Sequence, residues 1–211
     1  EKVSSSNLDS TIFSKKAGGT TVSGSLRICS LASISVFVTG GIGGVHRDAS
    51  ESMDVSADLQ AIKESKIITV CAGPKTILDI SKTYEVLETL SIPVFSYRQK
   101  NLPAFWYRDS GLRSACRIES PEAIAKIYTI ARETNNTNGL LLCNPIPKKY
   151  SMEQVHLEPL ISSGAIKLKR ANITGKKLTP SLLSYLVKKT NGQTLLSNIE
   201  LVKSNATLGA K

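Results

Sequence analysis

The chain contains few of the residues that mark several common protein classes. Aromatic residues make up only 5% of its 211 residues, and only two histidines occur. Few aromatics argue against a platform on which nucleic-acid bases stack, and the lack of a second histidine near His46 argues against a zinc site. No apolar run approaches the roughly 18 residues that a membrane-spanning helix needs, so we expect no membrane partner.

The cysteines are also few and scattered. Cys29, Cys71, Cys116 and Cys143 form no Cys-x-x-Cys pair, and at least two lie in apolar, strand-like runs. Such thiols behave as small hydrophobic groups and favour a reducing compartment. The opening segment from Glu1 is polar and lacks the order of a secretory signal. We therefore expect a cytoplasmic protein, with an organelle as the alternative because the sequence starts with Glu and is expected to begin inside a longer protein.

Charge is unbalanced, with 27 Lys and Arg against 17 Asp and Glu, a net charge of +10. This balance favours anionic partners, either small molecules or nucleic acid. Because aromatics do not interleave with the basic residues, we expect solvated faces rather than a nucleic-acid surface. The basic residues fall mainly into four pairs and one denser group: Lys15-Lys16, Lys148-Lys149, Lys176-Lys177, Lys188-Lys189, and Lys167 with Lys169 and Arg170.

Apolar β-branched runs alternate with amphipathic segments, which is typical of an α/β sheet. We predict one domain over residues 1–211, with a mixed sheet flanked by helices in α/β/α layers. The predicted strands are 33–39, 67–72, 93–97 and 139–144. The predicted helices are 20–31, 75–90, 120–134, 152–163, 179–190 and 193–203.

The most informative segment is the glycine run Thr39-Gly-Gly-Ile-Gly-Gly-Val-His-Arg47. Four glycines within five positions at a strand exit let backbone N–H groups approach an anion closely. The run therefore predicts a ligand site, in which Gly43, Gly44 and His46 are candidates. A flexible surface turn is the alternative.

Other candidate groups lie beyond the glycine run. Lys75 follows a buried strand, where partial burial favours a nucleophilic amine, although on local sequence alone an exposed lysine in a first helical turn is the commoner case. Asp54 and Asp58, four residues apart, could bind a hard cation or cap a helix. Asn198 either faces solvent or enters the site as an amide. Asn144, at another strand exit before two prolines, is a further candidate.

Six motifs taken together closely resemble the pseudouridine-5'-phosphate glycosidase family over almost the whole chain. They occur in order at the spacings of that family, which makes the match more specific than any one motif. The motifs are residues 38–47 (VTGGIGGVHR), 54–59 (DVSADL), 71–79 (CAGPKTILD), 102–105 (LPAF), 144–147 (NPIP) and 197–199 (SNI).

The resemblance implies a lyase-type reaction in which pseudouridine 5'-phosphate and water give uracil and ribose 5-phosphate, or the reverse. Lys75 matches the family's imine-forming lysine, and Asp54 matches an aspartate associated with a manganese ion. Asn198 matches an active-site amide. The resemblance also implies a homo-oligomer, with trimers in the family. The positions that match substrate contacts are Lys2, Val22, Ser56, Ala57 and Asp58.

The chain also departs from the family pattern. Family members carry a further portion before the segment matching Lys2, including a glutamate that donates a proton. The fold is therefore expected to lack the family's N-terminal portion, and turnover is expected to be impaired. The run Ser5-Ser6-Asn7 also replaces the charged residues expected there. A non-catalytic RNA or sugar-phosphate binding protein is the alternative function, and a different lysine aldolase is a third.

Overall fold

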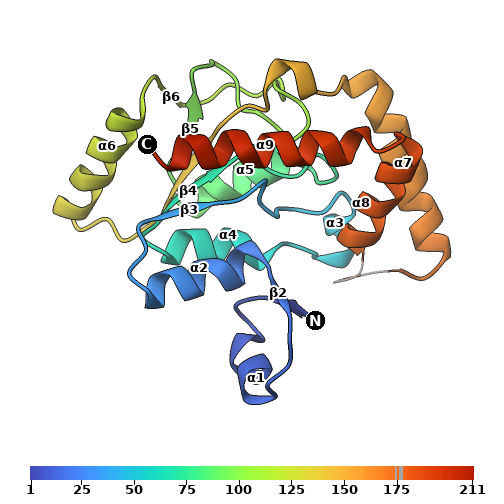
Figure 1. Cartoon of the computed structure of the whole chain (residues 1–211), viewed down its shortest axis with the longest axis horizontal. Helices are drawn as coiled ribbons and strands as arrows, with labels where there is room; N and C mark the ends of the chain where they lie inside the picture. Colours follow the sequence, from blue (N-terminus) through green and yellow to red (C-terminus); the bar gives the residue numbers. More distant parts are fainter. Residues whose placement is uncertain (174, 176–177) are drawn as a thin grey trace.

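The computed structural model describes residues 1–173, 175 and 178–211, so the predicted basic pair Lys176-Lys177 lies outside the described residues. In this part of the chain the main sheet has five strands in the order β3-β4-β7-β5-β6 (Figure 1). Every pairing between them is parallel. The strands are β3 (Val36–Val38), β4 (Ile68–Cys71), β5 (Val94–Tyr97), β6 (Cys116–Ile118) and β7 (Leu140–Cys143).

The α/β class is confirmed, but the sheet is parallel and not mixed. The physical reason is that each crossover returns the chain to the same end of the sheet, as parallel pairing requires, through helices in every case except the loop between β5 and β6. The crossover helices are α3 (Ala49–Ser52) with α4 (Ala57–Glu64), then α5 (Ile80–Thr89) and α6 (Pro121–Glu133). Strand β7 is the last strand of this sheet in the sequence, and it lies between β4 and β5.

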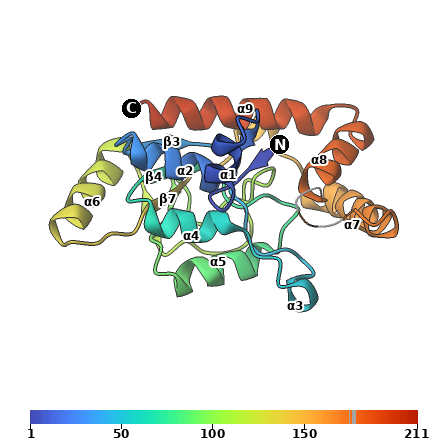
Figure 2. The same ribbon diagram turned by 90° about the horizontal axis from the view of Figure 1, so that it is seen from below.

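Side chains of alternate strand residues fill two separate cores, one on each face of the sheet. On one face Cys71 and Leu141 pack with residues of α2 (Val22–Leu31), α4 and α5. On the other face Val70 and Leu142 pack with residues of α6 and of α9 (Gln193–Gly209). Figures 1 and 2 show these helices on their two sides of the sheet, which confirms the expected flanking layers.

A third core lies beyond the carboxyl ends of the strands. Trp106, which is 1% exposed, packs there with residues of α7 (Gln154–Arg170), α8 (Leu178–Lys189) and α9. A short 3-10 helix, η1 (Lys148–Tyr150), leads from β7 towards α7. This core fixes the helical hairpin of α7 and α8 against the loops that follow the strands.

Several predicted boundaries were wrong. The helix expected from Lys75 begins at Ile80, because the side chain of Asp79 accepts a hydrogen bond from the Lys82 N–H and caps it there. Helix α7 continues to Arg170 beyond its expected end. Strand β6 and the short helices α3 and α4 were not predicted.

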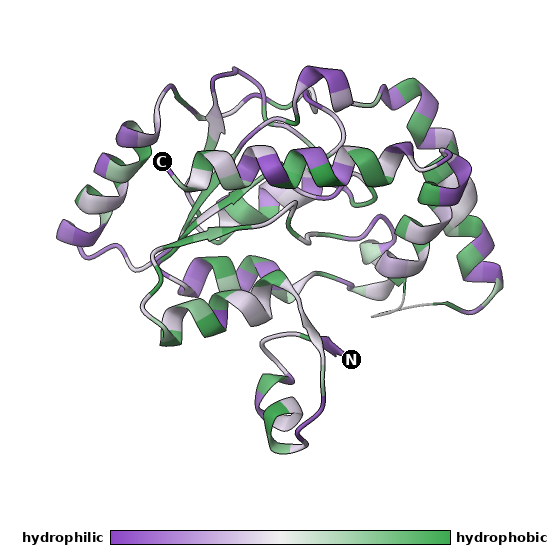
Figure 3. Ribbon diagram, in the orientation of Figure 1, coloured by the Kyte–Doolittle hydropathy of each residue, from purple (hydrophilic) through white to green (hydrophobic). Residues whose placement is uncertain are grey.

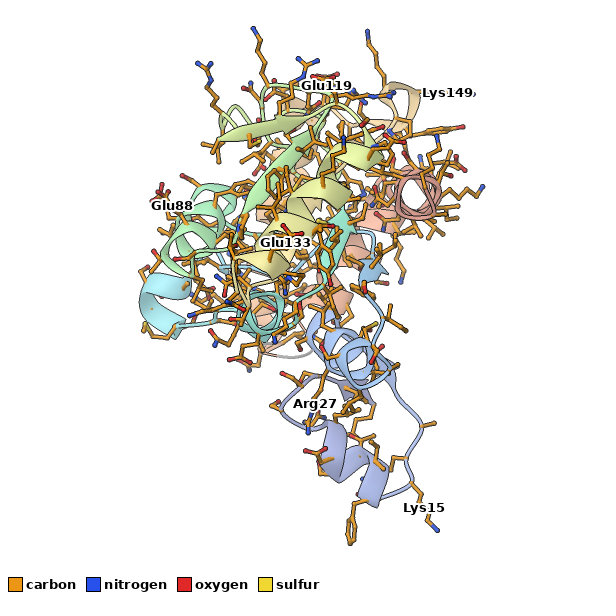
Figure 4. The ribbon with its side chains drawn as sticks, turned by 90° about the vertical axis from the view of Figure 1, so that its left-hand side faces the viewer. Lys15, Arg27, Glu88, Glu119, Glu133 and Lys149 are labelled. Atoms are coloured by element: carbon orange, nitrogen blue, oxygen red, sulfur yellow. The ribbon has the colours of Figure 1, made fainter. Side chains whose placement is uncertain are left out.

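The N-terminal residues form a small arm below the sheet. Strands β1 (Lys2–Val3) and β2 (Gly19–Thr20) pair in parallel, with α1 (Leu8–Phe13) between them, and all three were missed. Arg27, labelled in Figure 4, extends from α2 and makes two 2.9 Å hydrogen bonds to the Asp9 carboxylate of α1. The arm is therefore tied to the helix whose N-terminus reaches the candidate site.

All four cysteines are free thiols. None of the helices in the described part of the chain is both long and apolar enough to cross a membrane.

Two buried amides join α9 to the ends of the strands. Asn205, with no exposed surface, donates to the Thr39 carbonyl at 2.9 Å and accepts from the Asn144 amide at 3.0 Å. Asn144 in turn donates to Ser204 at 3.1 Å. Because buried polar groups without partners are costly, this network holds α9 in one position over the sheet.

Replacing Asn205 with leucine should therefore destabilise the fold. The Thr39 carbonyl and the Asn144 amide would each lose a partner, at a cost of about 1–3 kcal/mol in the free energy of unfolding. Urea unfolding followed by circular dichroism measures this cost. The exposed neighbour Thr207→Ala is the matched control and should change stability by less than about 0.5 kcal/mol. Equal stabilities for the two variants would contradict the structural role of the network.

Candidate active site

A cavity of about 1270 Å³ lies where the loops after β3 and β4 meet the N-terminal arm and the start of α8. Parallel sheets commonly bind ligands beyond the carboxyl ends of their strands, and this cavity occupies such a position. The structure brings most of the candidate residues together here. Those that line the cavity are Lys2, Val22, Gly43, His46, Asp54, Ser56, Ala57, Asp58 and Lys75.

Lys75 lies in the loop between β4 and α5, and not in a helical turn. Its N–H donates to the Ile42 carbonyl at 3.1 Å, and the Ile42 N–H donates to the Gly73 carbonyl at 3.2 Å. These bonds pair the loop that carries Lys75 with the glycine run. The position of the lysine is therefore set by the glycine run and not by a helix.

Withdrawal from water lowers the pKa of the Lys75 ammonium group. The negative charge of Asp58 opposes this shift, the positive charge of Lys2 adds to it, and Cys71 again opposes it. A lysine with a lowered pKa keeps more of its amine unprotonated near neutral pH, and the unprotonated amine is the nucleophile.

The glycine run is a tightly packed loop and not a flexible turn. A Cβ atom on Gly43 would lie 2.2 Å from Ser56 Oγ and 2.8 Å from Asp58 Oδ2. A Cβ atom on Gly44 would lie 2.4 Å from Thr83 Oγ1. Only glycine lets the backbone approach these side chains so closely.

Asp58 joins three elements around the cavity and is only 4% exposed. One carboxylate oxygen accepts from the Ser23 N–H of α2 at 2.9 Å, and the other accepts from the Gly43 N–H at 2.8 Å. Asp58 itself lies in the first turn of α4. Its carboxylate therefore holds the glycine run against the start of α2, a long-range role that the sequence did not reveal.

Two helix N-termini open towards the cavity. Helix α2 is capped by Thr21, which accepts from the Gly24 N–H, and α4 is capped by Ser56, which accepts from the Asp58 N–H. Helix N-termini carry partial positive charge and unpaired N–H groups, so they attract anions. The pairing of β1 with β2 adds Lys2 to the same wall. This wall suits a phosphate group.

His46 and Asp54 face each other on the other side of the glycine run. His46 Nε2 lies 3.7 Å from Asp54 Oδ2, and the His46 N–H donates to the Asp54 carbonyl at 3.0 Å. The Ser56 N–H donates to the Gly44 carbonyl at 2.9 Å, so residues 54–56 run alongside the glycine run. Asp54 is thus held by backbone pairing beside the cavity.

A charged cluster that the sequence analysis missed anchors the end of the glycine run. Arg47 makes two hydrogen bonds, of 2.7 and 3.0 Å, to the Glu158 carboxylate of α7, and another to the Thr76 carbonyl at 2.9 Å. The Tyr107 hydroxyl donates to the same carboxylate at 3.2 Å, and burial raises the pKa of Tyr107. The cluster joins the loops after β3 and β4 to α7.

Three candidates do not line the cavity in the described part of the chain. Asn198 accepts a 2.7 Å hydrogen bond from the Trp106 indole N–H, Asn144 belongs to the Asn205 network, and Gly44 packs on Thr83. These three residues make hydrogen bonds or packing contacts with distant parts of the chain, which the local sequence could not specify.

Other lining residues were not singled out from sequence. Ser23 follows the cap of α2, and Thr179 and Ser181 belong to the first turn of α8. The Thr179-Pro180 pair did predict the start of a helix there, and the same signal could have pointed to the first turn of α8 as a source of lining residues. Thr83 supports the glycine run, because its hydroxyl accepts a hydrogen bond from the Val45 N–H at 3.0 Å. Nothing in the local sequence around Thr83 indicates this role.

The chain matches the family described as indigoidine synthase A like protein over residues 1–211. It is 41% identical over 210 residues to a pseudouridine-5'-phosphate glycosidase of Staphylococcus aureus, covering 100% of this chain and 68% of the relative. It is 45% identical over 192 residues to one of Caldanaerobacter subterraneus, covering 91% of this chain and 62% of the relative.

Two solved structures have the same fold. An indigoidine synthase A-like protein of Thermotoga maritima superposes with a TM-score of 0.92 at 36% identity, covering 99% of this chain and 68% of that one. The prealnumycin C-glycosynthase AlnA, solved in complex with ribulose 5-phosphate, gives a TM-score of 0.91 at 30% identity with the same coverage.

The chain spans only 62–68% of the length of these relatives. Within that span the match is continuous in both sequence and structure. The chain therefore belongs to the indigoidine synthase A-like family, together with these pseudouridine-5'-phosphate glycosidases.

Proposed function

We propose that this chain carries the active site of a pseudouridine-5'-phosphate glycosidase, which cleaves pseudouridine 5'-phosphate to uracil and ribose 5-phosphate or joins them in reverse. The observation that carries the proposal is Lys75, a lysine with a lowered pKa at the wall of a large cavity. The names of the relatives favour this enzyme over the alternative of a non-catalytic RNA or sugar-phosphate binding protein.

The bond to be broken joins two carbon atoms, so protonating a glycosidic oxygen cannot release the base. An amine provides a covalent route. In this proposal the ribose opens by breaking the C1'–O4' bond: O4' takes the electron pair and a proton, uracil N1 gives up a proton, and C1' becomes doubly bonded to C5 of the ring. The Lys75 amine then adds to C1', it loses a proton, and C5 of the uracil ring takes up a proton. The C1'–C5 bond then breaks, its electron pair passes to the protonated uracil ring, and the nitrogen lone pair forms the imine. Water hydrolyses the imine, which releases ribose 5-phosphate and restores the amine.

The substrate phosphate is proposed to bind at the wall formed by Lys2 and the N-termini of α2 and α4. Val22 and Ala57 are the first residues of these helices, where N–H groups can reach an anion, whereas Ser56 can offer only its hydroxyl because its N–H already donates to the Gly44 carbonyl. Asp58 carries a negative charge, and both of its oxygens already accept hydrogen bonds. We infer that it positions this wall and does not contact the phosphate.

Asn198 stays a proposed contact on resemblance alone, because its oxygen accepts from Trp106 and its side chain does not line the cavity. Self-association, with a trimer expected from the family, is likewise proposed and can be measured by analytical ultracentrifugation.

Manganese remains part of the proposal. The Asp54 carboxylate and the His46 imidazole offer one oxygen and one nitrogen donor. Within the described residues no three His, Cys, Asp or Glu side chains come together to hold a metal. This donor set fits an ion that keeps several water ligands. Bound there, the ion would supply positive charge beside the sugar phosphate.

Borohydride trapping tests the lysine directly. Ribose 5-phosphate forms the imine without C–C cleavage, so a family proton donor is not needed. We expect a reduced ribose 5-phosphate adduct on Lys75 in the intact chain and none in Lys75→Arg, which keeps the charge but cannot form an imine. Because the pKa of Lys75 is lowered, trapping should begin at lower pH than for an exposed lysine. Peptide mass spectrometry locates the adduct.

The control for trapping is Lys82→Arg, a change at a lysine with a 56% exposed side chain. Its adduct yield should match that of the parent chain. Modification spread evenly over surface lysines, with no preference for Lys75, would refute the covalent part of the proposal.

Gly43→Ala tests the packed glycine run. The added methyl group would displace Ser56 and Asp58, so we expect a loss of about 1–3 kcal/mol in the free energy of unfolding and weaker trapping of ribose 5-phosphate. Gly19→Ala is the matched control, because a Cβ atom at Gly19 meets nothing within 4 Å. Thermal unfolding and adduct yield are measured together, and a Gly43→Ala chain as stable as the control would contradict this packing.

Asp54→Asn tests the metal. Loss of the carboxylate charge should weaken Mn²⁺ binding by about tenfold or more, measured as free Mn²⁺ by electron paramagnetic resonance. The exposed Asp109→Asn, in another loop, should leave binding unchanged. If the two variants bind Mn²⁺ equally well, Asp54 does not hold the ion.

A further inference from the structure

The two edges of the main sheet differ sharply in charge. The edge strand β6 carries Arg117, and Arg113 and Glu119 lie on either side of it. Charged side chains at an edge discourage another strand from pairing. The opposite edge strand, β3, lies within an uncharged run from residue 28 to residue 45. This edge therefore lacks the usual protection.

The backbone of β3 also presents unpaired groups. The Ser35 carbonyl accepts from the Ile68 N–H at 2.9 Å, and the Thr39 N–H donates to the Val70 carbonyl at 3.0 Å. Since neighbouring residues of a strand turn their peptide groups to opposite sides, those of Val36 and Val38 point away from β4. No strand in the described part of the chain pairs with this side.

Exposed apolar side chains flank the same edge. On the α2 side Leu31 is 79% exposed, and Ile34 follows it towards the strand, while Val36 lies on the α9 face near Gly209 and is 37% exposed. On the α9 side Ile199 and Val202 are both 44% exposed. Figure 3 shows β3 in hydrophobic green, with green segments on α2 and α9.

The apolar residues of α9 form a stripe that reaches the strand exit. Leu195, Ile199 and Val202 recur at spacings of four and three, so they lie on one side of the helix. Val202 Cγ2 would lie 3.2 Å from a Cβ atom on Gly40, the second residue after β3. The stripe therefore continues the apolar surface of the β3 edge. A surface of this kind marks an interaction site.

We propose that the outer edge of β3 is the docking site for an additional strand, supplied by the polypeptide that the relatives carry beyond the region this chain matches. The Thermotoga structure superposes over 99% of this chain, yet this region is only 68% of that protein. The remaining third of that protein is joined to a body that has this same shape. The β3 edge offers it unpaired peptide groups and apolar cover on both sides.

The proposal specifies the chemistry of the docked segment. Helices α2 and α9 lie on opposite faces of the sheet beside β3, so an added strand would be covered on both faces. Strands covered in this way are almost continuously apolar and rich in β-branched residues. The segment should therefore be extended, uncharged and apolar at successive positions. Because β3 leads directly into the glycine run, it would also lie next to the cavity loops.

The test uses the polypeptide that comprises the residues of the Staphylococcus aureus relative outside the matched region. It is added to the intact chain, and amide hydrogen exchange is followed by NMR. We expect exchange of the Val36 and Val38 amides to slow by about tenfold or more, because these amides would become paired. Val36→Lys should weaken binding by about tenfold or more, because a lysine at the edge opposes pairing.

The matched control is Ile130→Lys, which places the same charge on an exposed position of α6. It should bind the polypeptide as well as the parent chain, and circular dichroism confirms that both variants are folded. Absence of binding, or binding that leaves the Val36 and Val38 amides unprotected, would overturn the proposal. So would self-association of the chain through this edge that Val36→Lys abolishes, because the occupant would then be a second copy.

Discussion

The candidate site depends on one buried carboxylate. Asp58 accepts hydrogen bonds from the start of α2 and from the glycine run, and it lies in the first turn of α4. A charge that is 4% exposed is costly unless it is fully bonded, and here both oxygens have partners. The same charge opposes the lowering of the Lys75 pKa. One side chain thus sets the shape of the anion wall and moderates the lysine beside it.

Close backbone packing then carries this arrangement to the rest of the cavity. The glycines of the run, which have no side chains, lie directly against Ser56, Asp58 and Thr83. The backbone of the run also pairs with the loop that carries Lys75. Arg47 and Glu158 fix its far end to α7. The loops after two neighbouring strands are therefore held together as a single rigid unit. A nucleophile needs such support to be positioned accurately against its substrate.

The open edge of β3 and the cavity belong to the same part of the molecule, since β3 runs straight into the glycine run. The described body is well packed around its three apolar cores, and its uncharged edge is the place where that packing stops. A strand added there would extend the sheet beside the loops that form the site. The proposed added strand would connect the greater length of the relatives with the apolar surface of this edge.

The sequence by itself determined the α/β class and the main helices and strands, and it identified the glycine run and Lys75 as candidates for the site. These rest on short-range patterns: apolar periodicity, capping residues and glycines at a strand exit. Tertiary structure alone decided the parallel sheet, the bonds of Asp58, the Arg47–Glu158 pair and the packing of Asn144 and Asn198. Those contacts join residues 15 to 111 positions apart, so no local pattern encodes them. The packing of the apolar cores determines which elements come together and therefore which residues become partners. These partners meet only in the folded chain.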